Sequence, residues 1–82
     1  MKFDFYFGKD AADKYGEVVS EKLKGKTISK RQSDDGKPGS LRFEANNLGI
    51  EGFDMWKLLE CLEGMCFQGL AEEIDDSHYL VK

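Results

Sequence analysis

His78 is the only histidine of the chain, and four carboxylates lie close to it in sequence: Glu72, Glu73, Asp75 and Asp76. A histidine beside carboxylates has the residue types for general acid–base catalysis or for holding a metal ion. A zinc site needs several His or Cys ligands at recognised spacings, and the sequence contains none of these. Because Asp-Asp-Ser is also ordinary turn chemistry, we interpret this segment as a solvated turn.

The glycine-rich segment SDDGKPGS, residues 33–40, matches no known ligand-binding motif. It lacks the spread of oxygen ligands of a calcium loop and the spacing of a phosphate-binding loop. One histidine and scattered serines also do not make a nucleophilic triad. We therefore expect a non-enzymatic protein with no catalytic residues, metal or cofactor.

Cys61 and Cys66 lie five residues apart on a predicted helix, so they point about 140° away from each other. This is poor geometry for a disulfide, and the spacing is not that of a redox pair. We expect two free thiols, with Cys66 in the core and Cys61 partly exposed.

The net charge of −4 is unevenly distributed along the chain. Residues 44–82 contain two basic and nine acidic residues, whereas residues 1–43 contain ten basic and seven acidic ones. Such asymmetry concerns partners rather than the fold. The expected acidic contact residues are Glu60, Glu63, Glu72, Glu73, Asp75 and Asp76. The basic residues that could follow a nucleic-acid backbone are Lys22, Lys24, Lys26, Lys30, Arg31, Lys37 and Arg42.

Trp56 lies beside Glu60 and Glu63 on the predicted second helix, away from the centre of its apolar stripe. An exposed tryptophan on an acidic helix would anchor a partner. The alternative is that its ring folds over the edge of the sheet as part of the core.

Two helices are predicted from apolar residues at helical spacing. The first covers residues 10–24, with Asp10 as N-cap and Gly25 as the C-terminal stop. The second begins after the N-cap Asp54, and its stripe of Leu, Met and Cys continues through Cys66.

Alternating residues predict the strands. Residues 2–7 would place Phe3, Phe5 and Phe7 in the core and Tyr6 outside. Residues 26–32 and 40–46 would pair as a hairpin, the former as an edge strand. Residues 70–74 and 78–81 would form two short strands, or one bent strand.

This order predicts one α+β domain over residues 1–82, with the ferredoxin-like βαββαβ arrangement and both helices on one face of an antiparallel sheet. A hairpin at the end would add one strand. No apolar run approaches the ~20 residues of a membrane span, and no secretory signal is recognisable, so we expect a cytoplasmic protein.

The segment MWKLLECLEGMCFQGLAEEIDDSHYLV resembles small uncharacterised proteins carried by phages and mobile elements of Gram-positive bacteria. The resemblance covers about the last third of the chain and includes no catalytic motif. Small acidic α+β proteins of that setting include anti-CRISPR and other anti-defence inhibitors. The resemblance implies inhibition by occupying a host protein, with the acidic half imitating nucleic-acid phosphates.

The leading functional hypothesis is a protein-binding module, an accessory or inhibitor of a mobile element, whose acidic surface contacts a basic partner encoded by the host or by the element. Nucleic-acid binding through the basic hairpin of residues 22–42 is the first alternative. A homodimer formed by pairing of an edge strand is the second.

Overall fold

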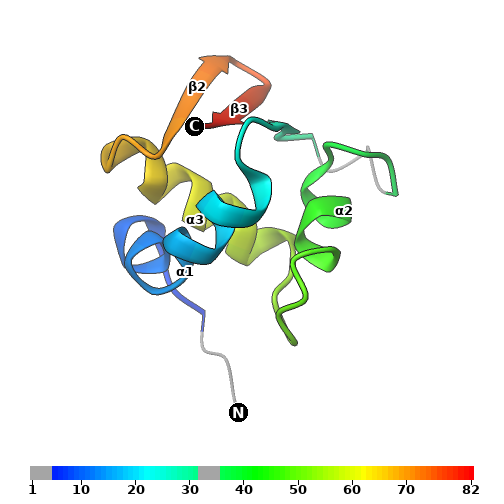
Figure 1. Cartoon of the computed structure of the whole chain (residues 1–82), viewed down its shortest axis with the longest axis horizontal. Helices are drawn as coiled ribbons and strands as arrows, with labels where there is room; N and C mark the ends of the chain where they lie inside the picture. Colours follow the sequence, from blue (N-terminus) through cyan, green and yellow to red (C-terminus); the bar gives the residue numbers. More distant parts are fainter. Residues whose placement is uncertain (1–4, 32–35) are drawn as a thin grey trace.

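Over its described residues, the chain forms an α+β structure of three helices and a three-stranded antiparallel sheet (Figure 1). This computed structural model describes residues 5–31 and 36–82. In chain order the elements are α1 (Gly8–Leu23), β1 (Thr27–Ser29), α2 (Leu41–Asn46), α3 (Met55–Phe67), β2 (Ala71–Asp75) and β3 (His78–Val81).

The sheet has the order β1-β3-β2, so β3 lies in the middle. The register pairs Ile28 with Tyr79 and Ala71 with Val81, and these four side chains are buried. His78 and Leu80 alternate with Tyr79 and Val81 and are partly exposed. The predicted edge strand and the two-strand form of the C-terminal segment are therefore confirmed.

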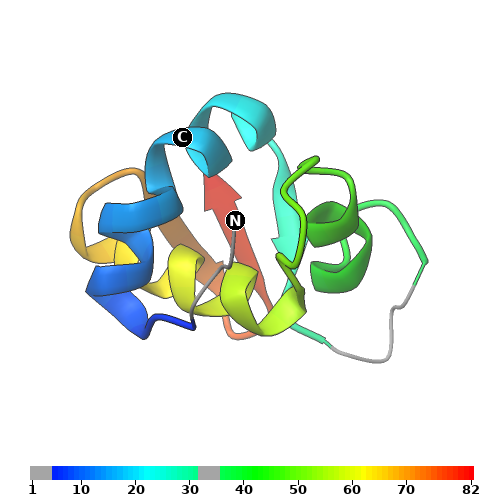
Figure 2. The same cartoon turned by 90° about the horizontal axis from the view of Figure 1, so that it is seen from below.

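Helices α1 and α3 pack against each other, and α3 lies across one face of the sheet, where it contacts β2 (Figure 2). The predicted N-cap of α3 is confirmed, since Asp54 accepts a hydrogen bond from the Lys57 N–H at 3.0 Å. The predicted N-cap of α1 is wrong, because α1 begins at Gly8. Its Gly8 N–H donates instead to Glu60 Oε1 of α3 at 2.8 Å.

Two glycines lie where α1 crosses α3. A Cβ atom at Gly64 would collide with the Gly8 carbonyl group and would lie 2.8 Å from Ala12 Cβ. A Cβ atom at Gly16 would lie 3.5 Å from Met65 Cγ, which is ordinary van der Waals contact. The absence of a side chain at Gly64 therefore lets the two backbones approach closely.

The thiols of α3 are both free, as predicted, but their exposure is reversed. Cys61 is buried with its Sγ 3.7 Å from Met65 Sδ, whereas Cys66 is partly exposed. The apolar stripe did not predict this because α3 is covered by α1, α2 and β2, which widens its buried face beyond the stripe.

Residues 40–46 form a helix, so the predicted strand is wrong. Ser40 is the N-cap, and its Oγ accepts a hydrogen bond from the Phe43 N–H at 3.2 Å. Leu41, Ala45 and Leu48 are buried at helical spacing. Glu44 is buried with them, although a strand would have turned it toward water. The predicted hairpin with residues 26–32 consequently does not form, and β1 pairs with β3.

Residues 5–7 are not part of a strand, and their predicted orientation is wrong. Tyr6 packs edge-on against Tyr15 at 6.0 Å between ring centroids, whereas Phe5 and Phe7 are 44% and 71% exposed. Phe3 lies outside the described residues. Because β3 already pairs on both sides, residues 5–7 do not take a central place in the sheet. The described order is α-β-α-α-β-β, and the βαββαβ order is not what these residues show.

Candidate functional site

The outer face of α3 has two exposed aromatic rings with two carboxylates between them. Trp56 and Phe67 are 47% and 87% exposed, and Glu60 and Glu63 are partly exposed. The spacing of 4, 3 and 4 residues keeps all four on one side of the helix, along about 16 Å. We call these four residues the α3 outer face. Exposed aromatic residues beside charged ones are typical of protein-binding surfaces.

A cleft of about 470 Å³ lies between the C-terminal part of α3 and the sheet. Its lining residues are Glu63, Cys66, Phe67, Glu73 and Tyr79. We call it the α3–sheet cleft. It combines two carboxylates with two aromatic rings. Two of the predicted acidic residues, Glu63 of α3 and Glu73 of β2, meet there.

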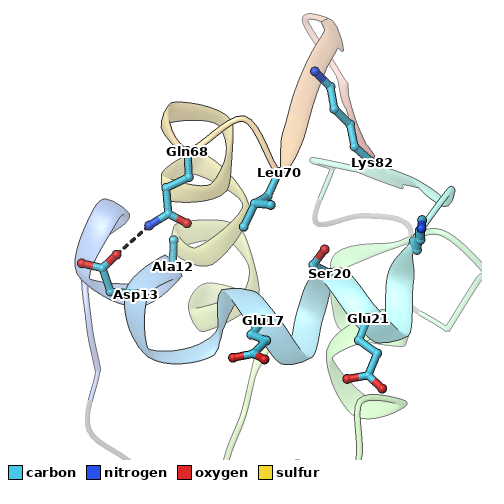
Figure 3. A pocket seen from close by; sticks show the side chains of 9 residues that line it. Ala12, Asp13, Glu17, Ser20, Glu21, Gln68, Leu70 and Lys82 are labelled. Atoms are coloured by element: carbon cyan, nitrogen blue, oxygen red, sulfur yellow. Dashed lines mark hydrogen bonds between the residues drawn. The ribbon is translucent and has the colours of Figure 1, made fainter.

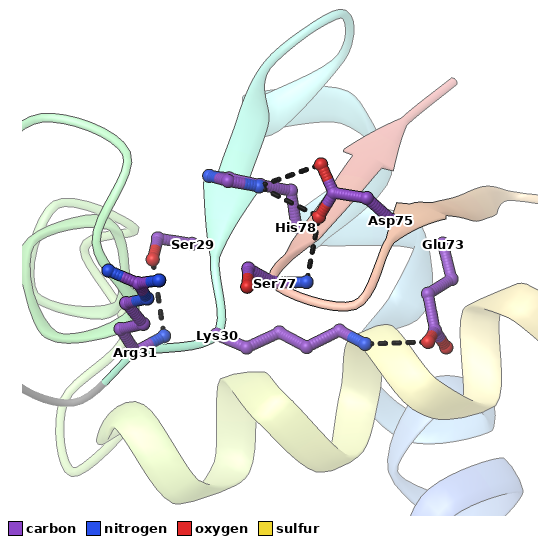
Figure 4. A network of polar contacts seen from close by, with 7 residues as sticks. All are labelled: Ser29, Lys30, Arg31, Glu73, Asp75, Ser77 and His78. Carbon is purple, nitrogen blue, oxygen red and sulfur yellow. Dashed lines mark hydrogen bonds and ion pairs between the residues drawn. The ribbon is translucent and has the colours of Figure 1, made fainter.

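Lys30 lies beside this cleft and binds two of its lining residues. Its Nζ is 2.8 Å from Glu73 Oε1, and it is 4.6 Å from the centroid of the Tyr79 ring. Figure 4 shows the lysine extending from the end of β1 toward Glu73. An ammonium group over an aromatic face is held by a cation–π interaction. The chain therefore already binds one of its own cations at this position.

The electrostatics leave excess negative charge at Glu63. Its pKa is raised by partial burial and then by the charges of Glu60 and Glu73, while Lys30 acts in the opposite direction. Within residues 5–31 and 36–82, no lysine or arginine lies within ion-pairing distance of Glu63. Burial and the charge of Glu63 also raise the pKa of Tyr79. A second cation placed here would relieve this repulsion.

The rest of the predicted acidic surface lies elsewhere. Glu72 pairs with Leu80 on the sheet face that points away from the helices, and Asp76 is exposed in the β2–β3 turn. Asp75 accepts hydrogen bonds from the Ser77 N–H at 2.7 Å and from His78 Nδ1 at 2.9 Å (Figure 4). These contacts, led by that of Ser77, lower the pKa of Asp75. The six carboxylates thus do not form one continuous surface.

The pairing of Asp75 with His78 is the nearest approach to catalytic geometry. A carboxylate that holds one ring nitrogen leaves the other free to act as a base. Both side chains, however, are substantially exposed at a hairpin turn, where water screens their interaction. Among the described residues, no group of three His, Cys, Asp or Glu side chains could hold a metal ion.

The predicted basic residues are scattered, and several are bound within the fold. Lys22 Nζ donates to the Leu48 carbonyl at 2.8 Å, and Lys26 pairs with buried Glu44 at 3.5 Å. Arg42 contacts Met55 Sδ at 3.8 Å. Lys30 is partly buried, and the other six members of the set are exposed. Since residues 40–46 are helical, these side chains do not line a basic hairpin.

A hollow of about 570 Å³ lies on the α1 side of the molecule (Figure 3). Carboxylates of α1, among them Glu17 and Glu21, line it together with Leu70 and Lys82. Asp13 is already bound to Gln68 at 2.6 Å. It brings together none of the predicted acidic residues and has no exposed aromatic ring among its lining residues.

The predictions missed Phe67, Tyr79 and the role of Lys30. Phe67 could have been found, because eleven residues after Trp56 place it only about 20° around the helix from that ring. Tyr79 and Lys30 reach Glu73 through strand pairing, for which the sequence has no comparable signal.

No helix among residues 5–31 and 36–82 is both long enough and apolar enough to cross a membrane. Comparisons with protein-family models, with curated proteins and with solved structures found no match.

Proposed function

We propose that this chain is a non-enzymatic protein-binding module that captures a basic partner through the α3 outer face and the adjoining α3–sheet cleft. The observation that supports this most is the nearly complete exposure of Phe67, at 87%, on the same side of α3 as Trp56. Leaving both rings in water forfeits the free energy that burial would provide, and a partner surface would supply that burial.

The carboxylates on this face favour a basic partner. Glu63 and Glu73 lie at the cleft, and Glu60 lies next to Glu63 on the helix. Opposite charges would speed and orient association more than they would strengthen it. An inhibitor of a host protein, as the C-terminal resemblance implies, would act in this way by covering a basic surface.

The two alternatives receive less support from the geometry. Lys26 pairs with Glu44 and Lys30 pairs with Glu73, and these ion pairs lower the charge available to a nucleic acid. A dimer through the edge strand β2 would bring its Glu72, Glu73 and Asp75 close to the same residues of a second copy. Like charges on adjoining strands oppose pairing, and the β2 bulge between Glu73 and Asp75 opposes it too.

The test compares capture of proteins by three immobilised chains, with mass spectrometry as the readout. These are the natural chain, the double variant Trp56→Ser with Phe67→Ser, and a control with Val18→Ser and Leu70→Ser. The control also removes two exposed apolar side chains, but on the α1 side. Circular dichroism would verify that all three are folded.

We expect a basic protein that the natural chain and the control capture and that the α3 variant loses. The captured amount should fall as salt rises, because the carboxylates contribute through exposed charges. Equal capture by all three chains, or equal loss from both variants, would show that the α3 outer face is not the binding surface.

A further inference from the structure

We propose that the α3–sheet cleft receives a cationic side chain, arginine or lysine, of the partner, and that this side chain competes with Lys30 for Glu73. The inference rests on the proposed function, since it names what the partner inserts at that site. The proposed function concerns the whole binding surface, whereas this inference concerns one cleft and one class of side chain.

The lining of the cleft matches such a side chain. The aliphatic stem of an arginine or lysine is apolar and its head is charged, so it needs an apolar wall beside anionic groups. Phe67 and Tyr79 supply aromatic walls, and Glu63 and Glu73 supply the carboxylates. Planar guanidinium groups also stack on exposed rings, and Phe67 is the most exposed ring in the described residues.

Lys30 shows that this chemistry operates in the molecule. Its ammonium group uses one carboxylate and one aromatic face of the cleft at the same time, Glu73 at 2.8 Å and the Tyr79 ring at 4.6 Å. Glu63 and Phe67 are the remaining pair of the same kind, and Glu63 has no such cation among the described residues. The chain's own lysine therefore already pairs with one of the two carboxylates that line the cleft.

Charge accounting favours a second cation. The charges of Glu60 and Glu73 raise the pKa of Glu63, and Lys30 is the cation that acts in the opposite direction. Glu60 is engaged by the Gly8 N–H, which is a neutral donor and cancels no charge. A cationic side chain beside Glu63 would reduce the remaining repulsion, whereas a neutral side chain of the same shape would not.

The test is an NMR titration of the full chain with short peptides that differ at one central residue: arginine, lysine or the neutral citrulline. We expect the two cationic peptides to shift the resonances of Glu63, Phe67 and Glu73, and the citrulline peptide to bind at least several-fold more weakly. Because an exposed ion pair contributes modestly, Glu63→Gln should weaken arginine binding about twofold to fivefold.

Lys30→Met supplies the decisive comparison, because it keeps an apolar stem but removes the competing ammonium group. We expect it to tighten arginine binding about twofold to fivefold relative to Lys24→Met, which changes net charge equally at an exposed position. Equal effects of the two lysine variants, or equal binding of arginine and citrulline peptides, would overturn the inference. If capture by the immobilised chain still depended on Trp56 and Phe67, the binding function would survive that failure.

Discussion

Replacing Gly64 by alanine would insert a methyl group at the closest approach of α1 and α3. Its Cβ would overlap the Gly8 carbonyl group and lie 2.8 Å from Ala12 Cβ, so backbone atoms and not a flexible side chain would have to move. Overpacking of this kind costs about 1–3 kcal/mol. Alanine is favoured over glycine inside a helix by about 1 kcal/mol, which offsets part of that cost.

The matched control is Gly16→Ala on the facing helix. Its Cβ would meet Met65 Cγ at 3.5 Å, which is a normal contact, so only the helix preference of about 1 kcal/mol remains. We therefore expect Gly64→Ala to lower the free energy of unfolding by up to about 2 kcal/mol and Gly16→Ala to raise it by up to about 1 kcal/mol.

Urea titrations followed by circular dichroism would measure both changes. Thermal unfolding gives a second measure, because each kcal/mol corresponds to a shift of about 4–8 °C in the thermal midpoint of a domain of this size. A difference in stability between the two variants is therefore easily resolved. If Gly64→Ala were at least as stable as the natural chain, or if both substitutions destabilised it equally, the close approach of α1 and α3 would be refuted.

Three further predictions follow from individual contacts. Asp54→Ala should lower the free energy of unfolding by about 1 kcal/mol through loss of the N-cap of α3, measured by urea titration, and an unchanged midpoint would contradict this role. The pKa of Asp75 is lowered in the folded chain. Its contribution to the free energy of unfolding is therefore present above the ordinary carboxyl pKa and is lost as the pH falls through the lowered pKa. Asp75→Asn should remove this part of the pH dependence, as acid-unfolding curves of the two chains would show. Burial raises the pKa of Cys61 to about 12 and also raises the pKa of Cys66. Iodoacetamide at pH 8 should therefore modify Cys66 slowly and Cys61 only on unfolding, as mass spectrometry would show. Rapid alkylation of Cys61 in the folded chain would contradict the described packing.

The helices α1 and α3 could be predicted because their apolar residues recur at an unambiguous helical spacing. Residues 40–46 were misassigned because Leu41 and Ala45 satisfy both the strand alternation and the helical spacing. The deciding signals were Ser40 as an N-cap and Leu48 one turn further on. Neither pattern predicts that the carboxylate of Glu44, which pairs with Lys26, is buried.

The N-terminal segment shows a different limit of sequence reasoning. Alternation correctly separates Tyr6 from Phe5 and Phe7, but it does not tell which side meets the core. That choice depends on Tyr15, whose ring Tyr6 contacts, and on the sheet, which has no central place for this segment. The α3–sheet cleft depends on strand register in the same way, so only its α3 half was predictable.

The hydrogen bond from the Gly8 N–H to Glu60 divides the α3 outer face into replaceable and fixed positions. Trp56, Glu63 and Phe67 project from the helix and do not hold another helix in place. Natural selection or a protein engineer could therefore vary them to change the partner while the fold stays intact. Glu60 also binds the first residue of α1, so replacing it would lower the stability of the fold whatever partner was sought. Retargeting should therefore proceed around a constant glutamate.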